Sequence, residues 1–202
     1  MGAPGSGKST LARSLACRLG TRIVCLDEIR RQRGRKWGYS TARADRIFDE
    51  SGAGALHRYE SKFELFVLRE VVAETAEGII DCSGGVHLQY GEKYRVLLKE
   101  TLAQVDSVVV AAPMDESPQP GGEALVRRLR ERGDDPFVRE WIDRGGRQLL
   151  SRLTAAAGTV THADLHRVVA VDDRTVEALT GSLGRCRGGG CSAGADEGGD
   201  DE

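Results

Sequence analysis

The chain has 202 residues, of which 40% are hydrophobic and 30% are charged, so one ordinary domain with a buried core is expected. The sequence contains no apolar run long enough to span a bilayer and no secretory signal, which predicts a cytoplasmic protein. The five cysteines form no CxxC pair, which indicates free thiols rather than disulfides or zinc. A net charge of -2 falls short of the basic footprint of a nucleic-acid-binding protein.

The chain opens with a complete phosphate-binding motif, because residues 2–9 (GAPGSGKS) match GxxxxGK[ST]. Glycines let the backbone curl so that its N–H groups point at phosphate oxygens, and the helix that follows adds its positive end. Lys8 is the expected catalytic cation at the β- and γ-phosphates, and Ser9 is the expected Mg²⁺ ligand. We therefore expect ATP to bind through Gly2, Pro4, Gly5, Ser6, Gly7, Lys8, Ser9 and Thr10. The motif alone does not separate a kinase from a hydrolase or a switch.

Helical and strand patterns then alternate along the chain. Leu11, Leu15 and Leu19 share one face of a predicted helix at 8–19, which Gly20 ends. Apolar runs predict buried strands at 23–26, 78–82, 107–112 and 167–171, and periodic segments predict helices at 55–77, 92–104, 122–132 and 173–183. This alternation predicts an α/β phosphate-loop fold in three layers, with a parallel sheet covered by helices on both faces.

The two ends of the sequence depart from this pattern. Residues 186–202 are rich in glycine and acids, so we expect one phosphate-loop domain at 1–185 followed by a disordered tail. A phosphate-binding loop normally follows a buried, central strand, yet only Met1 precedes Gly2. The sequence thus lacks the residues of the expected first strand, and we expect the natural chain to begin upstream.

Asp27 follows the predicted strand at 23–26, at the edge of a parallel sheet where ligands bind. A carboxylate there could accept a proton from an acceptor hydroxyl, or hold the metal through water. The alternative is that Asp27 caps the helix that begins with Glu28.

Several motifs together resemble the shikimate kinase family over residues 2 to about 98. They are the phosphate loop, the strand that ends at Asp27, the stretches IFDESG (47–52) and HRYE (57–60), and DCSGG (81–85). The resemblance implies phosphorylation of a hydroxyl and a small-molecule acceptor held by Asp27, His57, Arg58, Gly84 and Gly85. A tight turn is the alternative for the glycines, and a packed or exposed side chain is the alternative for His57.

This sequence departs from the family pattern at the acceptor side. The family's DxD pair reads Cys25-Leu26-Asp27, its carboxylate-binding arginine position holds His57, and its glycine triplet reads Ser83-Gly84-Gly85. The resemblance therefore implies the fold and the reaction more firmly than the acceptor, which we expect to be shikimate-like, a polyol or a cyclitol.

Residues 122–147 are rich in arginine and carry a helix-breaking Gly133-Asp134-Asp135-Pro136, which is typical of a lid that closes over transferring phosphates. Arg130 and Arg139 are the candidate catalytic arginines and Arg132 is a candidate nucleotide contact. A solvated helix face is the alternative for each of them. The basic run at 30–37 could attract an anion, or could be a solvated helix end.

These features predict an ATP-dependent small-molecule kinase that uses Mg²⁺, acts as a monomer, and has neither nucleic-acid nor membrane partners. Two alternatives stay open: a nucleoside or nucleotide kinase, and a nucleotide-binding regulatory protein without catalysis.

Overall fold

A computed structural model describes residues 1–112, 122–131, 133, 135–168 and 171–188. Its amino-terminal part contains α1 (Lys8–Leu19), β1 (Ile23–Cys25), α2 (Leu26–Gly34), a 3-10 turn (Arg35–Trp37), α3 (Thr41–Glu74), β2 (Ile79–Asp81) and α4 (Glu92–Leu102). Its carboxyl-terminal part contains β3 (Val108–Ala111), α5 (Gly122–Glu131), α6 (Pro136–Trp141), a π-helical turn (Ile142–Gly146), α7 (Arg147–Ala157), β4 (Leu165–Val168) and α8 (Asp173–Gly188). The predicted alternation of strands and helices is therefore present.

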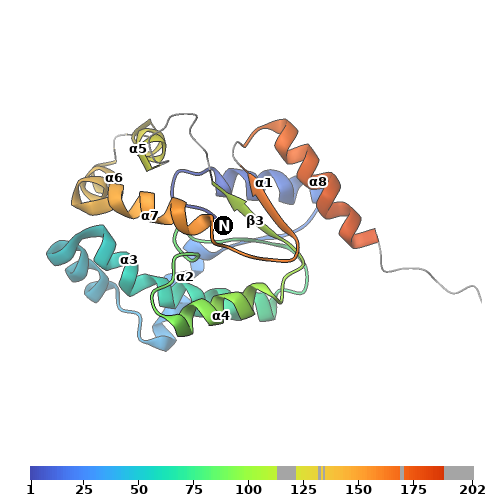
Figure 1. Cartoon of the computed structure of the whole chain (residues 1–202). Coiled ribbons are helices and arrows are strands. Elements are labelled where there is room, and N and C mark those ends of the chain that lie inside the picture. Colours follow the sequence, from blue (N-terminus) through green and yellow to red (C-terminus); the bar gives the residue numbers. More distant parts are fainter. Residues whose placement is uncertain (113–121, 132, 134, 169–170, 189–202) are drawn as a thin grey trace, which may run out of the picture.

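The described strands form two separate parallel pairs, β1 with β2 and β3 with β4. Met1 lies beside β3, close to the centre of the molecule (Figure 1). Its amino group donates to Val109 O at 2.6 Å, and Ala111 N donates to Met1 O at 2.8 Å. This pair of bonds is the pattern of a parallel ladder with Met1 opposite Val110.

Helices cover both faces of the strands (Figure 1). On one face Leu68 of α3 and Leu98 of α4 join Val108 and Val110 of β3 in the largest buried cluster. On the other face Leu11 of α1 and α8 pack against β2, β3 and β4 in a second cluster. The molecule is thus a mixed α/β fold with parallel strands between helices, which gives the carboxyl ends of the strands a common edge.

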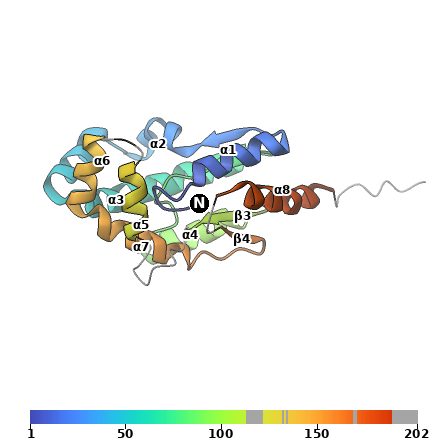
Figure 2. The same ribbon diagram turned by 90° about the horizontal axis from the view of Figure 1, so that it is seen from above.

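Helices α5, α6 and α7 gather at the opposite end of the molecule from α8 (Figure 2). Helix α5 packs on α7, and Leu125, Leu150 and Leu153 form a buried cluster that also contains Ala3 of the phosphate loop. The expected lid segment is therefore anchored to the loop through apolar contacts. None of the helices in the described part of the chain is long and apolar enough to cross a membrane.

Two helices differ from the sequence-based prediction. Helix α2 was predicted only as the alternative in which Asp27 caps a helix, because its apolar side chains are few. Leu26 joins the buried cluster that contains Leu65 of α3. Arg30 and Arg33 pair with glutamates of α3. Helix α3 starts well before the predicted residue 55 and breaks at Gly52, where φ is 73°. A Cβ on Gly52 would lie 2.3 Å from Arg144 O, so the break requires glycine for its backbone angle and for the close approach.

The predicted strand at 167–171 overlaps β4 (Leu165–Val168), which begins two residues earlier, and residues 169 and 170 lie outside the described residues. Helix α8 continues to Gly188, and the rest of the expected disordered tail lies outside the described residues. The strand expected ahead of the phosphate loop stays a prediction.

Candidate active site

The phosphate loop has the backbone geometry that its glycines predict. Gly5 and Gly7 adopt left-handed φ values of 84° and 86°, and α1 begins directly after Gly7 with no side-chain cap and no acid in its first turn. The first intrahelical bond is Leu11 N to Gly7 O, so the N–H groups at the start of the helix remain available to a ligand. The loop therefore fits an anion at the helix N-terminus.

The buried hydroxyl of Ser6 also supports a bound anion at the loop. Ser6 is 3% exposed, and its Oγ has no hydrogen-bond partner among the described residues. A buried polar atom without a partner is costly unless a ligand or water satisfies it. Phosphate oxygens are acceptors of the kind that a serine hydroxyl in this loop would bind.

Lys8 and Asp81 line one cavity together with Met1. Lys8 is half-buried and forms no ion pair within the described residues, while Asp81 is 5% exposed and ends β2. Ser9 is half-buried and Thr10 exposed. Because no group of three or more metal-ligating His, Cys, Asp or Glu side chains forms in the described residues, a Mg²⁺ ion would depend on the nucleotide phosphates and Ser9.

The turn Ser83-Gly84-Gly85 joins the phosphate loop to the acceptor side. A Cβ on Gly84 would lie 2.8 Å from Pro4 Cδ, and one on Gly85 would lie 2.1 Å from His57 Nε2. Both glycines are therefore required by close approach, to the phosphate loop on one side and to α3 on the other. The turn holds the two halves of the site together.

His57 is 8% exposed and has partners at both ring nitrogens. Nε2 lies 3.1 Å from Gly85 O and Nδ1 lies 3.0 Å from Tyr90 Oη. Since a carbonyl oxygen only accepts, Nε2 carries the proton and Nδ1 accepts from the tyrosine. Burial lowers the pKa of His57 to about 4, so the ring is neutral at physiological pH.

The acceptor side also contains a buried ion-pair network around Arg30 of α2. Arg30 Nη1 contacts Glu64, which is 4% exposed, and lies 3.3 Å from Glu60 Oε2. Tyr39 Oη donates to Glu60 Oε1 at 3.0 Å. Burial raises the pKa of both glutamates, and the charge of Arg30 opposes that shift.

Asp27 belongs to the same network. It is the second residue of α2, and Cys25 occupies the N-cap, so Asp27 does not cap this helix. Its Oδ1 lies 3.7 Å from Arg30 Nε, and its side chain is 49% exposed. The carboxylate is therefore oriented by an arginine and accessible to a ligand.

Arg58 is exposed, and its guanidinium lies 5.3 Å from the ring centre of Tyr90. Arg152 of α7 lies 5.4 Å from the same ring. The ring of Tyr90 thus lies close to two guanidinium groups, and its hydroxyl is bonded to His57. Neither guanidinium has a carboxylate partner among the described residues.

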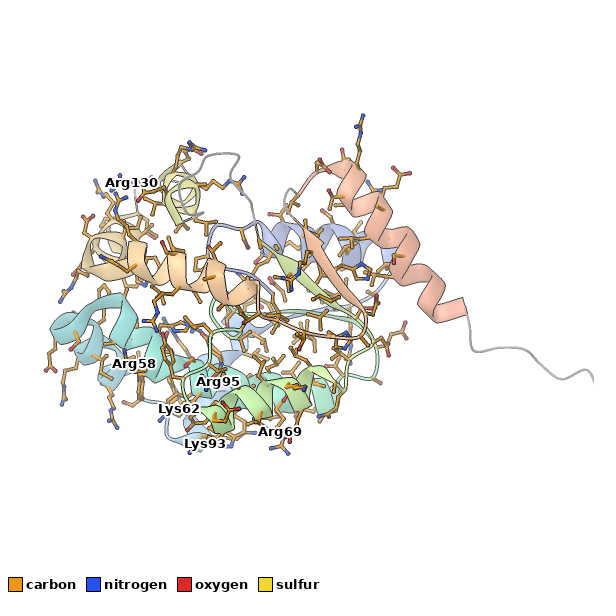
Figure 3. All side chains as sticks on the ribbon, in the orientation of Figure 1. Arg58, Lys62, Arg69, Lys93, Arg95 and Arg130 are labelled. Atoms are coloured by element: carbon orange, nitrogen blue, oxygen red, sulfur yellow. The ribbon has the colours of Figure 1, made fainter. Side chains whose placement is uncertain are left out.

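The candidate lid arginines have different surroundings. Arg130 is half-exposed and lies 4.0 Å from Asp143 Oδ1, and Arg139 lies on the exposed surface of α6. Figure 3 shows Arg130 on α5 and Arg58 on α3, with α7 between them in this view. Arg132 lies outside the described residues. Helix α5 itself reaches the phosphate loop, because a Cβ on Gly5 would meet Leu125 O and Leu129 Cγ at 3.3 Å.

Sequence reasoning missed Arg30, Glu64 and Tyr90 as members of the site. Arg30 lay inside a basic run that was also compatible with a solvated surface. The available signal was the four-residue spacing of Glu60 and Glu64, which puts two carboxylates on one face of a helix. Asp81 belongs to the DCSGG motif, which gave it no predicted role. Its burial and its place in the same cavity as Lys8 depend on the three-dimensional fold.

The family model described as shikimate kinase matches residues 4–117. No curated protein matches the sequence.

Among solved structures, shikimate kinase from Bacteroides thetaiotaomicron is 17% identical, with a TM-score of 0.50 over 93% of this chain and 96% of that chain. Shikimate kinase from Acinetobacter baumannii in complex with shikimate is 19% identical, with a TM-score of 0.44 over 92% of this chain and 89% of that chain. The structural likeness concerns the fold, and the family match spans more than half of the sequence: the chain belongs to the shikimate kinase family.

Proposed function

We propose that this protein transfers the γ-phosphoryl group of ATP to a hydroxyl of a small, uncharged polyol or cyclitol. The observation that carries the proposal is the turn at Gly84 and Gly85, which contacts the phosphate loop at Pro4 and the acceptor helix at His57. A nucleotide on the loop and an acceptor beside His57 would thus be contacted by one short segment, as transfer between bound groups requires.

The loop residues supply the phosphate chemistry. The N–H groups after Gly7 would hold the phosphates, Ser9 would contact Mg²⁺, and Lys8 would neutralise charge that develops as the bond from the γ-phosphorus to its bridging oxygen breaks. Arg130 and Arg139 would add charge from α5 and α6 when these helices close over the nucleotide. The metal, when bound with ATP, would neutralise the β- and γ-phosphate oxygens.

Asp27 is the proposed base. The acceptor hydroxyl attacks the γ-phosphorus, its proton passes to the Asp27 carboxylate, and ADP leaves with the bridging oxygen. The support is that Asp27 is half-exposed while Arg30 orients it.

The charge balance of the network favours a neutral acceptor. Arg30 already pairs with the carboxyl groups of Asp27, Glu60 and Glu64, so its guanidinium is not free to bind an acceptor carboxylate. His57 stands where the family resemblance implies an arginine, and its low pKa leaves it uncharged. Three carboxyl groups around one guanidinium would repel an anionic acceptor.

An acceptor screen tests the proposal. Neutral polyols and cyclitols, hydroxy acids including shikimate, and nucleosides are each incubated with ATP and Mg²⁺, and products are followed by phosphorus NMR. We expect phosphorylated neutral polyol or cyclitol in amounts equal to the ADP formed. Phosphorylation of nucleosides alone would favour the nucleoside-kinase alternative, and ADP formation independent of every acceptor would refute the proposal.

A further inference from the structure

Four cations of α3 and of the first turn of α4 form a surface that we call the basic stripe: Arg58, Lys62, Arg69 and Lys93. Figure 3 shows Arg58, Lys62 and Arg69 in order along α3, with Lys93 beside them in this view. The three residues of α3 are four and seven positions apart, so they share one face of the helix. At 1.5 Å per residue this face is about 16 Å long. Arg58, Arg69 and Lys93 are exposed and Lys62 is half-buried.

None of the four cations is paired with a carboxylate in the part of the chain that the structure describes. The neighbouring carboxylates already have partners, because Glu70 pairs with Arg33 and Lys36, and Glu92 pairs with Arg95. Like charges four residues apart on a helix repel each other, so the fold gains no stability from this arrangement. A bound polyanion would remove that repulsion.

A row of aromatic rings crosses the basic stripe. Phe66 lies on α3 within the stripe, and its ring centre is 5.6 Å from that of Trp37 and 6.1 Å from that of Tyr94. Trp37 is 37% exposed, and Lys93 Nζ lies 4.8 Å from the ring centre of Tyr94. Cations that bind phosphates, next to aromatic rings that stack on bases, are the features by which proteins bind single-stranded nucleic acid.

The shape of the basic stripe favours a linear polyanion over a flat anionic surface. Glu70 directly follows Arg69 and Glu92 directly precedes Lys93, so a membrane that covered the stripe would also approach these carboxylates. A single strand can instead follow the cations alone. The net charge of -2 argues against a nucleic-acid partner for the chain as a whole, but it does not describe the charge of one face.

We propose that the basic stripe binds single-stranded nucleic acid, without sequence preference, beside the candidate active site. The four cations contact successive phosphates, and Trp37 and Tyr94 stack on bases. Because the contacts go to the backbone and to the faces of bases, affinity depends on salt rather than on base identity.

The test is the fluorescence anisotropy of a labelled oligouridine of about 12 nucleotides, titrated with the full chain at several salt concentrations. We expect the logarithm of the association constant to fall against the logarithm of salt concentration with a slope of about -2.8, which is about 0.7 for each of the four cations. No turnover is measured, so the result does not depend on the proposed phosphoryl transfer.

A double variant with Lys62→Gln and Arg69→Gln should weaken binding about tenfold at low salt and change the slope to about -1.4. The matched control is the double variant with Arg13→Gln and Arg174→Gln, which loses the same charge from exposed positions of α1 and α8. It should change neither affinity nor slope. Tyr94→Leu should weaken binding and leave the slope unchanged, because it removes stacking and no charge.

Equal effects of the two double variants would overturn the proposal, because binding would then follow net charge. Absence of oligouridine binding would also overturn it, as would equally tight binding of polyglutamate or of phosphatidylserine vesicles. Lys8→Ala should bind oligouridine as the unsubstituted protein does. A loss of binding in that variant would place the strand on the phosphate loop and refute the assignment to the basic stripe.

Discussion

The phosphate side and the acceptor side of the site are built in different ways. The phosphate side is one continuous loop whose ligand groups are backbone N–H groups, the half-buried Lys8 and the small hydroxyl of Ser6. The acceptor side draws Asp27, Glu64 and Gly85 from α2, α3 and a turn, and a buried charge network holds it together. Substitutions on the phosphate side should therefore affect chemistry, whereas many on the acceptor side should affect folding as well.

The largest effect should come from the acceptor-side network. Arg30→Met leaves Glu60 and Glu64 buried without a cation, and we expect the free energy of unfolding to fall by about 3–5 kcal/mol. The matched control is Arg33→Met, because Arg33 also pairs with two glutamates but is more exposed, and it should cost about 1 kcal/mol or less. Urea unfolding measures both, and equal losses would contradict a special role of the Arg30 network.

Lys8→Ala should separate chemistry from folding. We expect the rate of phosphoryl transfer to fall on the order of 10²–10³-fold, because one charge at the γ-phosphate is lost. The stability should change by less than about 0.5 kcal/mol, since Lys8 makes no ion pair within the described residues. Arg13→Ala, on the exposed face of α1, is the control for both measurements. A transfer rate equal to that of the control would remove Lys8 from the mechanism.

The contrast between these regions also explains what could be predicted from sequence. The phosphate loop, α1 and the alternation of strands and helices follow from local patterns, because a glycine motif and an apolar run specify their own conformation. The acceptor side depends on partners far apart in the chain, such as Arg30 with Glu64 and Gly85 with His57. Helix α2 was predicted only as an alternative for a related reason, since its few apolar residues give little local signal and its ion pairs with α3 join residues far apart in the chain.

The turn between the two sides should tolerate no side chain. Gly85→Ala places a Cβ 2.1 Å from His57 Nε2, and we expect a loss of about 1–3 kcal/mol in the free energy of unfolding. Gly54→Ala is a suitable counterpart, because a Cβ there has no neighbour within 4 Å in helix α3. It should stabilise the protein by about 0.5–1 kcal/mol. A harmless Gly85→Ala would show that the turn does not contact His57 closely.

The neutral histidines predict a pH dependence of stability. Burial lowers the pKa of His57 and of His87 to about 4, below the ordinary value of 6.5, so the folded state binds fewer protons than the unfolded state in that range. The two histidines therefore contribute to the free energy of unfolding above pH 6.5, and this contribution is lost as the pH falls towards 4. The raised pKa values of Glu60 and Glu64 make the free energy of unfolding change with pH in the opposite direction.

His57→Gln should therefore reduce the slope of unfolding free energy against pH by up to about 1.4 kcal/mol per pH unit. The measurement is urea unfolding at several values between pH 4 and pH 6.5, compared with the unsubstituted protein. An unchanged slope would mean that His57 is not held neutral.

A smaller effect is expected on the preference between charged and neutral acceptors when His57 is replaced. His57→Arg would add a cation beside Gly85, next to Arg58 and Arg152 at Tyr90. We expect the ratio of transfer to hydroxy acids over neutral polyols to rise about tenfold, the effect of one ordinary charge-assisted bond. The readout is kcat/KM for a matched pair of acceptors that differ in a carboxylate. A ratio that stays constant would place the acceptor away from His57.

The most direct test of transfer to a hydroxyl beside Asp27 is Asp27→Asn, with ATP affinity measured by calorimetry and transfer measured with the best acceptor from the screen. The two side chains have nearly the same shape, and Asp27 is too exposed for its pairing with Arg30 to govern folding. The account predicts unchanged ATP affinity and a loss of transfer on the order of 10²-fold or more. Unchanged transfer with unchanged affinity would contradict it.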